Sequence, residues 1–467
     1  MADFRNYIYY DHTISLCNEC HRQISAKIIF EGNKVFLSKT CRHHGHQKVL
    51  IADDVAFYKE IRNFNKASEY PKKPHTKTEF GCPYDCGICP DHEQHSCLTL
   101  VEVTDRCNLT CPTCYAGSSP TYGRHRTLAE IEMMLDAIVA SEGEPDVVQI
   151  SGGEPTIHPH FFEILDMAKG KPIKHLMVNT NGMRIANDPA FTKRLANYMP
   201  DFEIYLQFDS FKPEVLTALR GKDLSDVRMK ALKNLNKYNL STTLVVTLQK
   251  GMNDDEIGKI VDYALKQKCV RGVTFQPTQI SGRLENFDPA TDRLTNTEVR
   301  RKILEQTNVF QPNDLIPVPC NPDALIMGYA LKYMGRVEGL THLIDPEVLL
   351  NSSKNTIVYE QDEQLHEHVL EMFSTGNSPE KAGDTLHQLL CCLPKFIAPK
   401  LDYNNLFRVI IMNFMDAYDF DVRAIKKSCV HIVDKDGKII PFETMNLFYR
   451  DDLKHKLAEI RNELSHG

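Results

Sequence analysis

The sequence predicts an α/β protein whose core, residues 99–310, is a partial (βα)6 barrel. Between residues 98 and 277, six short β-branched or apolar runs alternate with stretches of helical periodicity. Ten of the fifteen cysteines fall into three tight groups before residue 115, and glycine or amide residues follow several of the runs. Since barrel chemistry takes place at the carboxyl ends of the strands, we expect the functional groups there.

Composition limits the classes of protein that the chain can represent. A length of 467 residues predicts two or three domains, and 42% hydrophobic with 25% charged residues is typical of a globular protein. The net charge is −7 without a long block of either sign, so we expect no nucleic-acid partner. The first residues lack the features of a signal peptide and no run reaches about 20 apolar residues, so a cytoplasmic location is expected.

Residues 1–75 read as a small strand-and-loop module that binds a metal ion. Cys17 and Cys20 form a CxxC pair, and Cys41 is followed by His43 and His44. This spacing predicts a rubredoxin-like or zinc-ribbon-like mononuclear site, with His44 as the fourth ligand and His43 as the alternative. The ligands suit iron and zinc equally. The basic, proline-containing stretch Tyr70–Thr78 is interpreted as a linker.

Residues 76–98 contain a second group of cysteines, namely Cys82, Cys86, Cys89 and Cys97. Four sulfur atoms within sixteen residues can complete an auxiliary [4Fe-4S] cluster without outside ligands. A zinc ion is the alternative, because four thiolates suit either metal.

The barrel core has a regular order of expected elements. A capping box from Thr127 to Glu130 marks the start of the first helix. The expected strands are Leu98–Val103, Val147–Ile150, His175–Val178, Glu203–Phe208, Thr242–Leu248 and Gly272–Phe275.

The third group of cysteines, Cys107, Cys111 and Cys114, directly follows the first expected strand at Cx3Cx2C spacing. A cubane cluster has four irons, so three thiolates leave one iron open to a cofactor or substrate. A zinc ion with a remote fourth ligand is the alternative.

Polar loops follow the next three strands. Gly152 and Gly153 let the backbone approach a ligand closely, and Glu154 and Pro155 complete the SGGEP sequence. The third and fourth strands end in amide, carboxylate and hydroxyl groups that can bind a ligand, although Asn181 and Ser210 equally suit capping of the following turns. These groups are Asn179, Asn181, Gln207, Asp209 and Ser210.

The Cx3Cx2C loop after the first strand, joined to GGEP after the second, resembles the radical S-adenosylmethionine (SAM) superfamily. The resemblance implies that Cys107, Cys111 and Cys114 hold the catalytic cluster and that the polar loops from Gly152 to Ser210 bind SAM. It also implies reductive cleavage of SAM to a 5′-deoxyadenosyl radical, which abstracts hydrogen from an unactivated C–H bond. Thr113 stands where members usually have an aromatic residue, and Tyr115 follows the third cysteine.

The complete order of motifs resembles the tetraether synthase-like and dihydropterin methyltransferase-like group. This resemblance implies auxiliary [4Fe-4S] clusters, a mononuclear iron or zinc site, and a reductant such as ferredoxin or flavodoxin. Its first implication is C–C bond formation on a lipid chain, with peripheral membrane contact and an apolar tunnel that includes Phe407–Met415. The alternative is methyltransferase-like modification of a pterin or another small molecule in a short polar pocket. An electron carrier without catalysis is the third hypothesis.

Residues 311–467 are expected to be mostly helical, with helices at Leu365–Phe373, Pro379–Leu390 and Asp451–Leu464. The proline-rich stretch Gln311–Pro322 marks the boundary with the core. Cys269 reads as a buried small hydrophobic residue. A second auxiliary cluster is expected on Cys320, Cys391, Cys392 and Cys429, against the alternative of unliganded thiols. Ser428 and Glu443 stand where the family pattern has cysteines, which predicts that this cluster is altered or absent.

Overall fold

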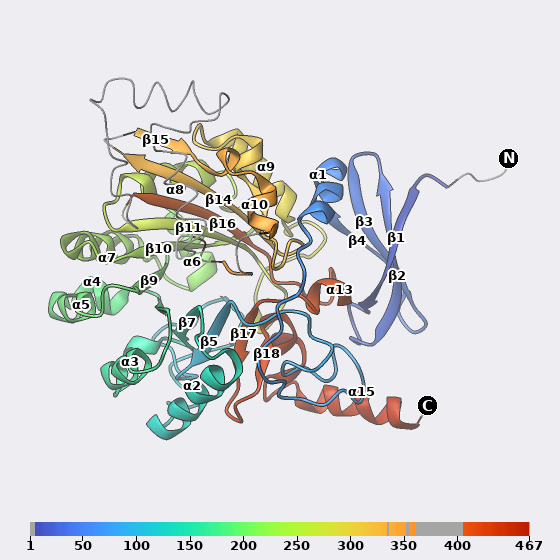
Figure 1. The fold of residues 1–467 in the computed structure, drawn as a ribbon, viewed down its shortest axis with the longest axis horizontal. Coiled ribbons are helices and arrows are strands. Elements are labelled where there is room, and N and C mark those ends of the chain that lie inside the picture. Colours follow the sequence, from blue (N-terminus) through green and yellow to red (C-terminus); the bar gives the residue numbers. More distant parts are fainter. Residues whose placement is uncertain (1–4, 334–335, 352–354, 358, 360–404, 467) are drawn as a thin grey trace.

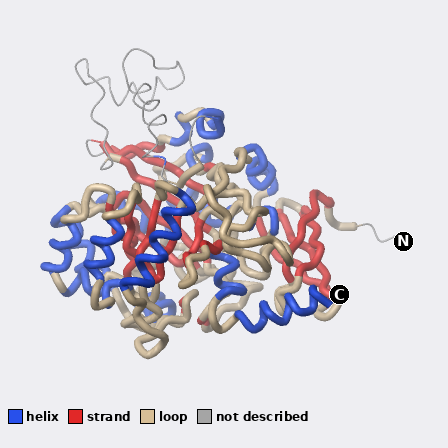
Figure 2. Tube along the Cα trace, turned by 60° about the horizontal axis from the view of Figure 1, so that its bottom comes forward, coloured by secondary structure: helices blue, strands red, loops and turns tan. Residues whose placement is uncertain are grey.

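The computed structural model describes residues 5–333, 336–351, 355–357, 359 and 405–466. A large mixed sheet with helices along its outer face forms the centre of the molecule, and a smaller N-terminal sheet packs beside it (Figure 1). The turned view shows the same arrangement, with the N-terminal strands lying apart from the helix-covered sheet (Figure 2).

The N-terminal sheet is an antiparallel meander of β1 (Ile8–Leu16), β2 (Gln23–Glu31), β3 (Lys34–Cys41) and β4 (Gly45–Ala52). Gly32 adopts φ +58° in the tight turn between β2 and β3, a conformation that glycine tolerates best. Along β3, buried Val35 and Leu37 alternate with more exposed residues, as a sheet with one covered face requires. The short helix α1 (Val55–Glu60) then joins this module to the main core through buried Phe57.

All six expected barrel strands are present, parallel and neighbouring in chain order: β5 (Leu98–Glu102), β7 (Val147–Ser151), β8 (His175–Thr180), β9 (Phe202–Gln207), β10 (Thr242–Leu248) and β11 (Val270–Pro277). The expected capping box forms, since Thr127 and Glu130 each satisfy the other's backbone N–H. The helices of this region are α2 (Leu128–Glu142), α3 (Phe161–Lys169), α4 (Met183–Asn187), α5 (Pro189–Ala196), α6 (Pro213–Arg220), α7 (Ser225–Tyr238), α8 (Ile257–Lys266) and α9 (Asn296–Gln306).

The barrel strands are buried on both faces, as parallel sheets usually are. One face, with residues such as Val101 and Ile150, packs in the same hydrophobic cluster as the helices. The other face carries Leu98, Leu100 and Val245 and belongs to a second cluster in the interior. Along each strand, successive side chains therefore pack alternately against the helical layer and into the interior that holds the candidate site.

The expectation of a mostly helical C-terminal region is corrected for the described residues, which add six strands to the main sheet. Their apolar runs cover both ends of the parallel sheet, where unpaired backbone groups would otherwise be exposed. β16 pairs in parallel with β11, and β17 pairs in parallel with β5. The strands are β13 (Ile316–Pro317), β14 (Leu325–Tyr333), β15 (Arg336–Gly339), β16 (Leu406–Met412), β17 (Val430–Val433) and β18 (Ile439–Pro441).

Of the three expected C-terminal helices, 365–373 and 379–390 lie outside the described residues. The third corresponds to α15 (Lys454–His466), which lies near the N-terminal sheet in Figure 1. Shorter elements are β6 (Thr113–Cys114), β12 (Arg283–Leu284), α10 (Pro346–Asn351), α13 (Val422–Ile425) and α14 (Phe442–Thr444). In the described part of the chain, no helix is long and apolar enough to cross a membrane.

Candidate metal and cofactor site

The cysteine loop after β5 lies at the carboxyl end of the barrel strands. Cys107, Cys111 and Cys114 all line one interior cavity of about 180 Å³. Arg283 holds the loop from outside, since its Nε donates to the carbonyl oxygen of Cys111 at 2.5 Å. The two-stranded pairing of β6 with β12 fixes the end of the same loop. The three thiols are thus positioned by backbone contacts as well as by sequence spacing.

The two glycines after β7 pack against the cysteine loop. Gly153 donates its N–H to the carbonyl oxygen of Thr104 at 2.8 Å. A Cβ on Gly152 would lie 2.3 Å from that oxygen, and a Cβ on Gly153 would lie 2.2 Å from the carbonyl oxygen of Arg106. Glycine is therefore required at both positions because the backbone of this turn lies against the backbone of residues 104–106. Both glycines also line the cavity.

Glu154 ties together the loops that surround the cavity. Its buried carboxylate accepts hydrogen bonds from Thr180 Oγ1 at 2.7 Å and from the backbone N–H of Asn181 at 2.8 Å. Burial raises the pKa of Glu154 above its usual value. Asn181 in turn donates to Asn108 Oδ1 in the cysteine loop at 2.7 Å and accepts from Met183 N–H at 3.0 Å. Asn181 thus lines the cavity and caps the next turn as well.

The remaining expected SAM-binding residues divide into two sets. Asn179 and Gln207 line the cavity. Asp209 and Ser210 do not, because Asp209 is fully buried beside Arg220 and Ser210 Oγ accepts the N–H of Lys212 at 2.9 Å. Pro155 starts a short 3₁₀ helix and also lies away from the cavity wall. Of this second set, Asp209 and Ser210 are placed to hold the loops rather than to touch a ligand.

Arg220, at the end of α6, was missed in the sequence because a basic residue in the last turn of a helix is ordinary. Its guanidinium lines the cavity and donates to Asp209 at 2.6 and 2.8 Å and to Thr247 Oγ1 at 2.7 Å. Burial opposes the charge, but the Asp209 carboxylate raises the pKa of Arg220 above its usual value. A fixed cation therefore lies beside the cysteine loop.

The donor set fits a [4Fe-4S] cluster with one open iron. Burial raises the pKa of Cys107 to about 12, so this thiol stays protonated unless a bound cation replaces its proton. Among the residues that the structure describes, the cavity lining contains three cysteines and no fourth. Cys107, Cys111 and Cys114 are the residues that would hold the cluster, and Arg220 would offset part of its negative charge.

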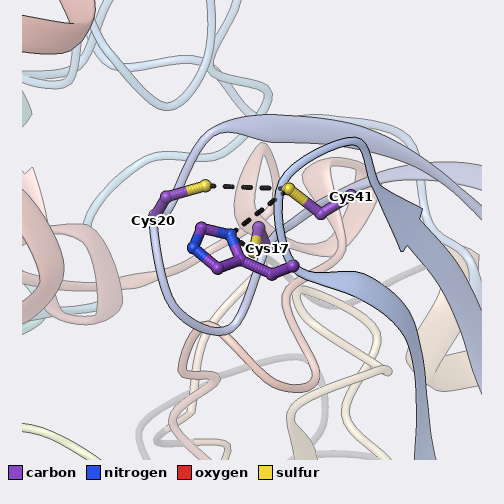
Figure 3. A group of neighbouring side chains, drawn as sticks. Cys17, Cys20 and Cys41 are labelled. Atoms are coloured by element: carbon purple, nitrogen blue, oxygen red, sulfur yellow. Dashed lines mark hydrogen bonds between the residues drawn. The ribbon is translucent and has the colours of Figure 1, made fainter.

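The N-terminal site brings its four expected residues together. Cys17, Cys20, Cys41 and His44 present ligand atoms that all lie within 4.8 Å of one another. Figure 3 shows the three cysteines converging, and His44 Nδ1 is 3.4 Å from Cys17 Sγ and 3.5 Å from Cys41 Sγ. Burial opposes ionisation of Cys41, but N–H groups of His43 and His44 lower its pKa to about 6. His44 rather than His43 supplies the fourth donor atom of this group, which is the number that a structural zinc or rubredoxin-type site needs.

The expected cluster on Cys82, Cys86, Cys89 and Cys97 is corrected, because Cys97 lies elsewhere. Its thiol forms a buried group with Cys320 and Cys429, with all three sulfurs within 4.8 Å of one another. Cys97 and Cys429 directly precede β5 and β17, whose parallel pairing puts the two cysteines side by side. Cys82, Cys86 and Cys89 line a separate small cavity. Cys391 and Cys392 fall outside the described residues.

Ser428 and Glu443, which stand where the family pattern has cysteines, contact each other. Ser428 Oγ donates to the Glu443 carboxylate at 2.9 Å in a fully buried position, and burial raises the pKa of Glu443 to about 7. In the described part of the chain, no fourth histidine, cysteine or carboxylate places a ligand atom within 4.8 Å of all three sulfurs of Cys97, Cys320 and Cys429, although His95 Nε2 lies 3.8 Å from Cys97 Sγ.

Two family models match the chain. The model of the radical SAM superfamily matches residues 101–264, and the model of the HMPTM N-terminal zinc ribbon domain matches residues 9–53. The first contains the cysteine loop and the glycine pair, and the second contains all four ligand candidates of the N-terminal site.

Similar proteins include the 7,8-dihydro-6-hydroxymethylpterin dimethyltransferase of Methanocaldococcus jannaschii, which is 29% identical over 96% of this chain and 95% of its own. A probable GTP 3′,8-cyclase of Thermococcus kodakarensis is 30% identical over 36% of this chain and 52% of its own. Among solved structures, SuiB of Streptococcus suis bound to S-adenosylmethionine aligns with a TM-score of 0.36 at 18% identity, covering 44% of this chain and 46% of SuiB.

The fold, the cysteine loop and the family models agree. The cofactors are a [4Fe-4S] cluster and SAM, and the further cysteine groups fit auxiliary and mononuclear metal centres. Residues 101–264 therefore form a radical SAM domain, and residues 9–53 form an N-terminal zinc ribbon.

Proposed function

We propose that this enzyme modifies a small heterocyclic molecule in the manner of a methyltransferase that acts on a pterin. The observation that carries the proposal is a set of primary amides in the wall of the 180 Å³ cavity, contributed by four different strands: Gln149, Asn179, Gln207 and Gln276. Asn179 and Gln207 are among the groups expected to bind SAM, so Gln149 and Gln276 are the two amides that we assign to the substrate. Each amide offers two donors and one acceptor, which is the complement that a heterocycle with ring nitrogens and exocyclic groups requires. The similarity to a pterin dimethyltransferase over nearly the full chain supports the same substrate class.

Neighbouring groups orient two of these amides. Gln276 Nε2 donates to Tyr205 Oη at 3.2 Å. Gln207 Nε2 donates to Asp209 at 2.7 Å and to Thr247 at 3.2 Å, so its carbonyl oxygen takes no part in either bond. Side chains that are held in this way can recognise a polar ligand without losing much conformational freedom.

When bound at Cys107, Cys111 and Cys114, the cluster and SAM supply a carbon radical able to take a hydrogen atom from an unactivated C–H bond. The chain's own part is to hold the substrate and exclude water. The cavity lies in the interior of the sheet, and its wall also includes apolar residues such as Leu98, Leu100 and Val245. Such apolar walls keep water away from reactive groups. The enzyme also needs a one-electron reductant, for which we propose a ferredoxin or a flavodoxin.

The second candidate function is C–C bond formation on a lipid chain. Met412 and Phe414, from the segment expected to form a tunnel wall, line the same cavity. The same lining includes primary amides, and a saturated hydrocarbon chain cannot form hydrogen bonds with them. We therefore place the lipid substrate second.

The first experiment is anaerobic reconstitution with iron and sulfide, followed by an assay for 5′-deoxyadenosine from SAM in the wild type and in Cys107→Ala. A dihydropterin and a long-chain isoprenoid lipid are then compared as stimulants. We expect the dihydropterin to stimulate turnover, Gln276→Leu to remove that stimulation at least tenfold, and Met412→Leu to leave it within twofold. Stimulation by the lipid alone would overturn the proposal, and a metal-loaded protein without 5′-deoxyadenosine would remove its chemical basis.

A further inference from the structure

Cys82, Cys86 and Cys89 line a small cavity. Cys97, which was expected to be their fourth ligand, groups with Cys320 and Cys429 instead. The three thiols of the cavity come from one turn-rich segment, and the C-terminal residues Ile425, Lys426 and Pro441 close the other side. Cys86 and Cys89 are buried and Cys82 is partly exposed. Three thiols around one cavity require a further donor if they are to complete a four-ligand site, and His92 lines the same cavity.

The hydrogen bonds of His92 decide which of its nitrogens is available. Its Nε2 lies 2.9 Å from the carbonyl oxygen of Ser428. A carbonyl only accepts, so Nε2 carries the proton and donates it. In a neutral ring Nδ1 then holds the lone pair, and among the described residues Nδ1 has no hydrogen-bond partner.

A second buried histidine is consistent with this tautomer. His431 Nε2 lies 3.1 Å from His92 Nε2, and His431 Nδ1 lies 3.0 Å from Ser96 Oγ. If the one N–H of His92 Nε2 is shared between the Ser428 carbonyl oxygen and His431 Nε2, then His431 accepts at Nε2 and donates from Nδ1 to Ser96. The Ser96 hydroxyl can then donate to Thr99 Oγ1 at 2.7 Å. The whole chain of bonds is satisfied with both rings neutral.

Local backbone geometry places His92 next to the last cysteine. The N–H of His92 donates to the carbonyl oxygen of Cys89 at 3.0 Å, so the ring follows Cys89 within one turn. The spacing is therefore Cx3Cx2Cx2H. Histidines that bind metals commonly donate their second N–H to a backbone carbonyl, which is the bond that His92 makes to Ser428.

Other polar side chains on this wall are less suitable. Asp85 Oδ2 already accepts three backbone N–H groups, at 2.7, 2.5 and 2.7 Å. Lys426 carries a cation, and Asp91 is exposed. Among the described residues that line this cavity, His92 is the buried neutral side chain that can supply a further donor atom.

We propose that His92, through Nδ1, is the fourth protein ligand of a metal centre held by Cys82, Cys86 and Cys89. A Cys3His set suits an iron–sulfur cluster and a zinc ion alike. An imidazole in place of a thiolate removes one negative charge, which raises the reduction potential of an iron–sulfur centre. The proposal does not depend on the substrate of the enzyme.

The test uses the full-length chain with Cys107, Cys111 and Cys114 changed to alanine, which removes the signal of the catalytic cluster. The protein is labelled with ¹⁵N-histidine, reconstituted with iron and sulfide, and given zinc at the N-terminal site. Pulsed EPR of the reduced protein should show one imidazole nitrogen coupled to a cluster. His92→Ala should lose this coupling, and His92→Cys should keep the cluster with a lower potential and no coupling.

His158→Ala is the matched control, because His158 is also buried and its Nε2 also lies 2.9 Å from a backbone carbonyl oxygen, that of Arg126. It should retain the coupling. If the centre takes zinc instead, His92→Ala should release one zinc ion to a competing chelator at least tenfold faster than the parent or His92→Cys. A coupling that persists in His92→Ala overturns the proposal, as does an iron-loaded parent without nitrogen coupling or an unchanged rate of zinc release.

Discussion

The Sγ atoms of Cys320 and Cys429 lie 3.6 Å apart, although 109 positions separate them in the sequence. Cys320 follows β13, which lies at one end of the main sheet, and Cys429 precedes β17, next to the other end. The two ends of the sheet therefore meet at this pair, with Cys97 beside them. A metal ion or cluster at these sulfurs would fasten the ends together.

Cys320→Ser should lower the iron and sulfide bound per chain by about one centre, because this buried group would keep two thiols only. It should also lower the melting temperature. Anaerobic reconstitution with iron and sulfide analysis measures the first effect. Cys269→Ser is the control, since Cys269 is equally buried but lies in the helical side of the core. Equal iron in both variants would contradict a metal centre at Cys320.

Gly153→Ala should disrupt the cysteine loop, because its Cβ would lie 2.2 Å from the carbonyl oxygen of Arg106. Backbone cannot yield as a flexible side chain would, so we expect about 1–3 kcal/mol of destabilisation and a more than tenfold loss of 5′-deoxyadenosine formation. Gly170→Ala, whose Cβ would meet its nearest atom at 3.4 Å, should keep near-normal activity. Normal cleavage of SAM by Gly153→Ala would show that the tight contact has no role.

Arg220→Met should leave the buried Asp209 carboxylate without its closest cation, at a cost of about 3–5 kcal/mol. Adding Asp209→Asn should recover only part of that stability, because the amide needs no counter-charge but buried Arg228, 3.5 Å from Asp209, then loses its carboxylate. If Arg220 serves the cysteine loop directly, the double variant should stay poorly active. Urea unfolding and the 5′-deoxyadenosine assay separate the two effects, and recovery of both together would assign Arg220 a purely structural role.

Glu203, Arg408 and His175 form a buried polar group in the interior of the barrel sheet, with Arg408 Nη2 3.2 Å and His175 Nε2 3.4 Å from the Glu203 carboxylate. Burial opposes ionisation, but Arg408 and His175 hold the pKa of Glu203 below its ordinary value of 4.5. Because the pKa is depressed in the folded state, this stabilisation is complete above about pH 4.5 and is lost as the pH falls below it.

Glu203→Gln should therefore unfold at lower urea concentration than the wild type at pH 7, by about 3–5 kcal/mol. The difference between the two proteins should shrink progressively below pH 4.5. Urea unfolding at several pH values measures it. A difference that stays constant down to the lowest pH at which both proteins fold would show that ionised Glu203 does not carry the effect.

His44→Ala should weaken metal binding at the N-terminal site, because three thiols and no imidazole would remain within 4.8 Å of one another. We expect release of the ion to a chelator to be at least tenfold faster. His43→Ala should bind the metal normally, since the imidazole of His44 contacts the cysteine sulfurs, whereas His43 contacts Cys41 through its backbone N–H, which alanine keeps. Faster release of the ion from His43→Ala than from His44→Ala would assign the ligand to His43 instead.

Local pattern was enough to predict much of this protein. The six barrel strands, the Thr127–Glu130 capping box, the N-terminal zinc ribbon with His44, and the placement of the cysteine loop after the first strand all depend on residues close in sequence. Periodicity and ligand spacing act over a few residues, so one sequence displays them directly. The strands of the C-terminal region were missed because short apolar runs do not reveal which sheet edge they cover.

By itself the sequence determined the radical SAM core, because the cysteine spacing and the glycine pair are local requirements of that site. Only the tertiary structure decided that Cys97 joins Cys320 and Cys429 rather than its sequence neighbours, and that Arg220 reaches the cysteine loop from the end of α6. The reason is that strand pairing sets the first contact, and packing of α6 against the cysteine loop sets the second. Parallel register puts the residues before β5 and β17 side by side, and no spacing within either segment contains that information.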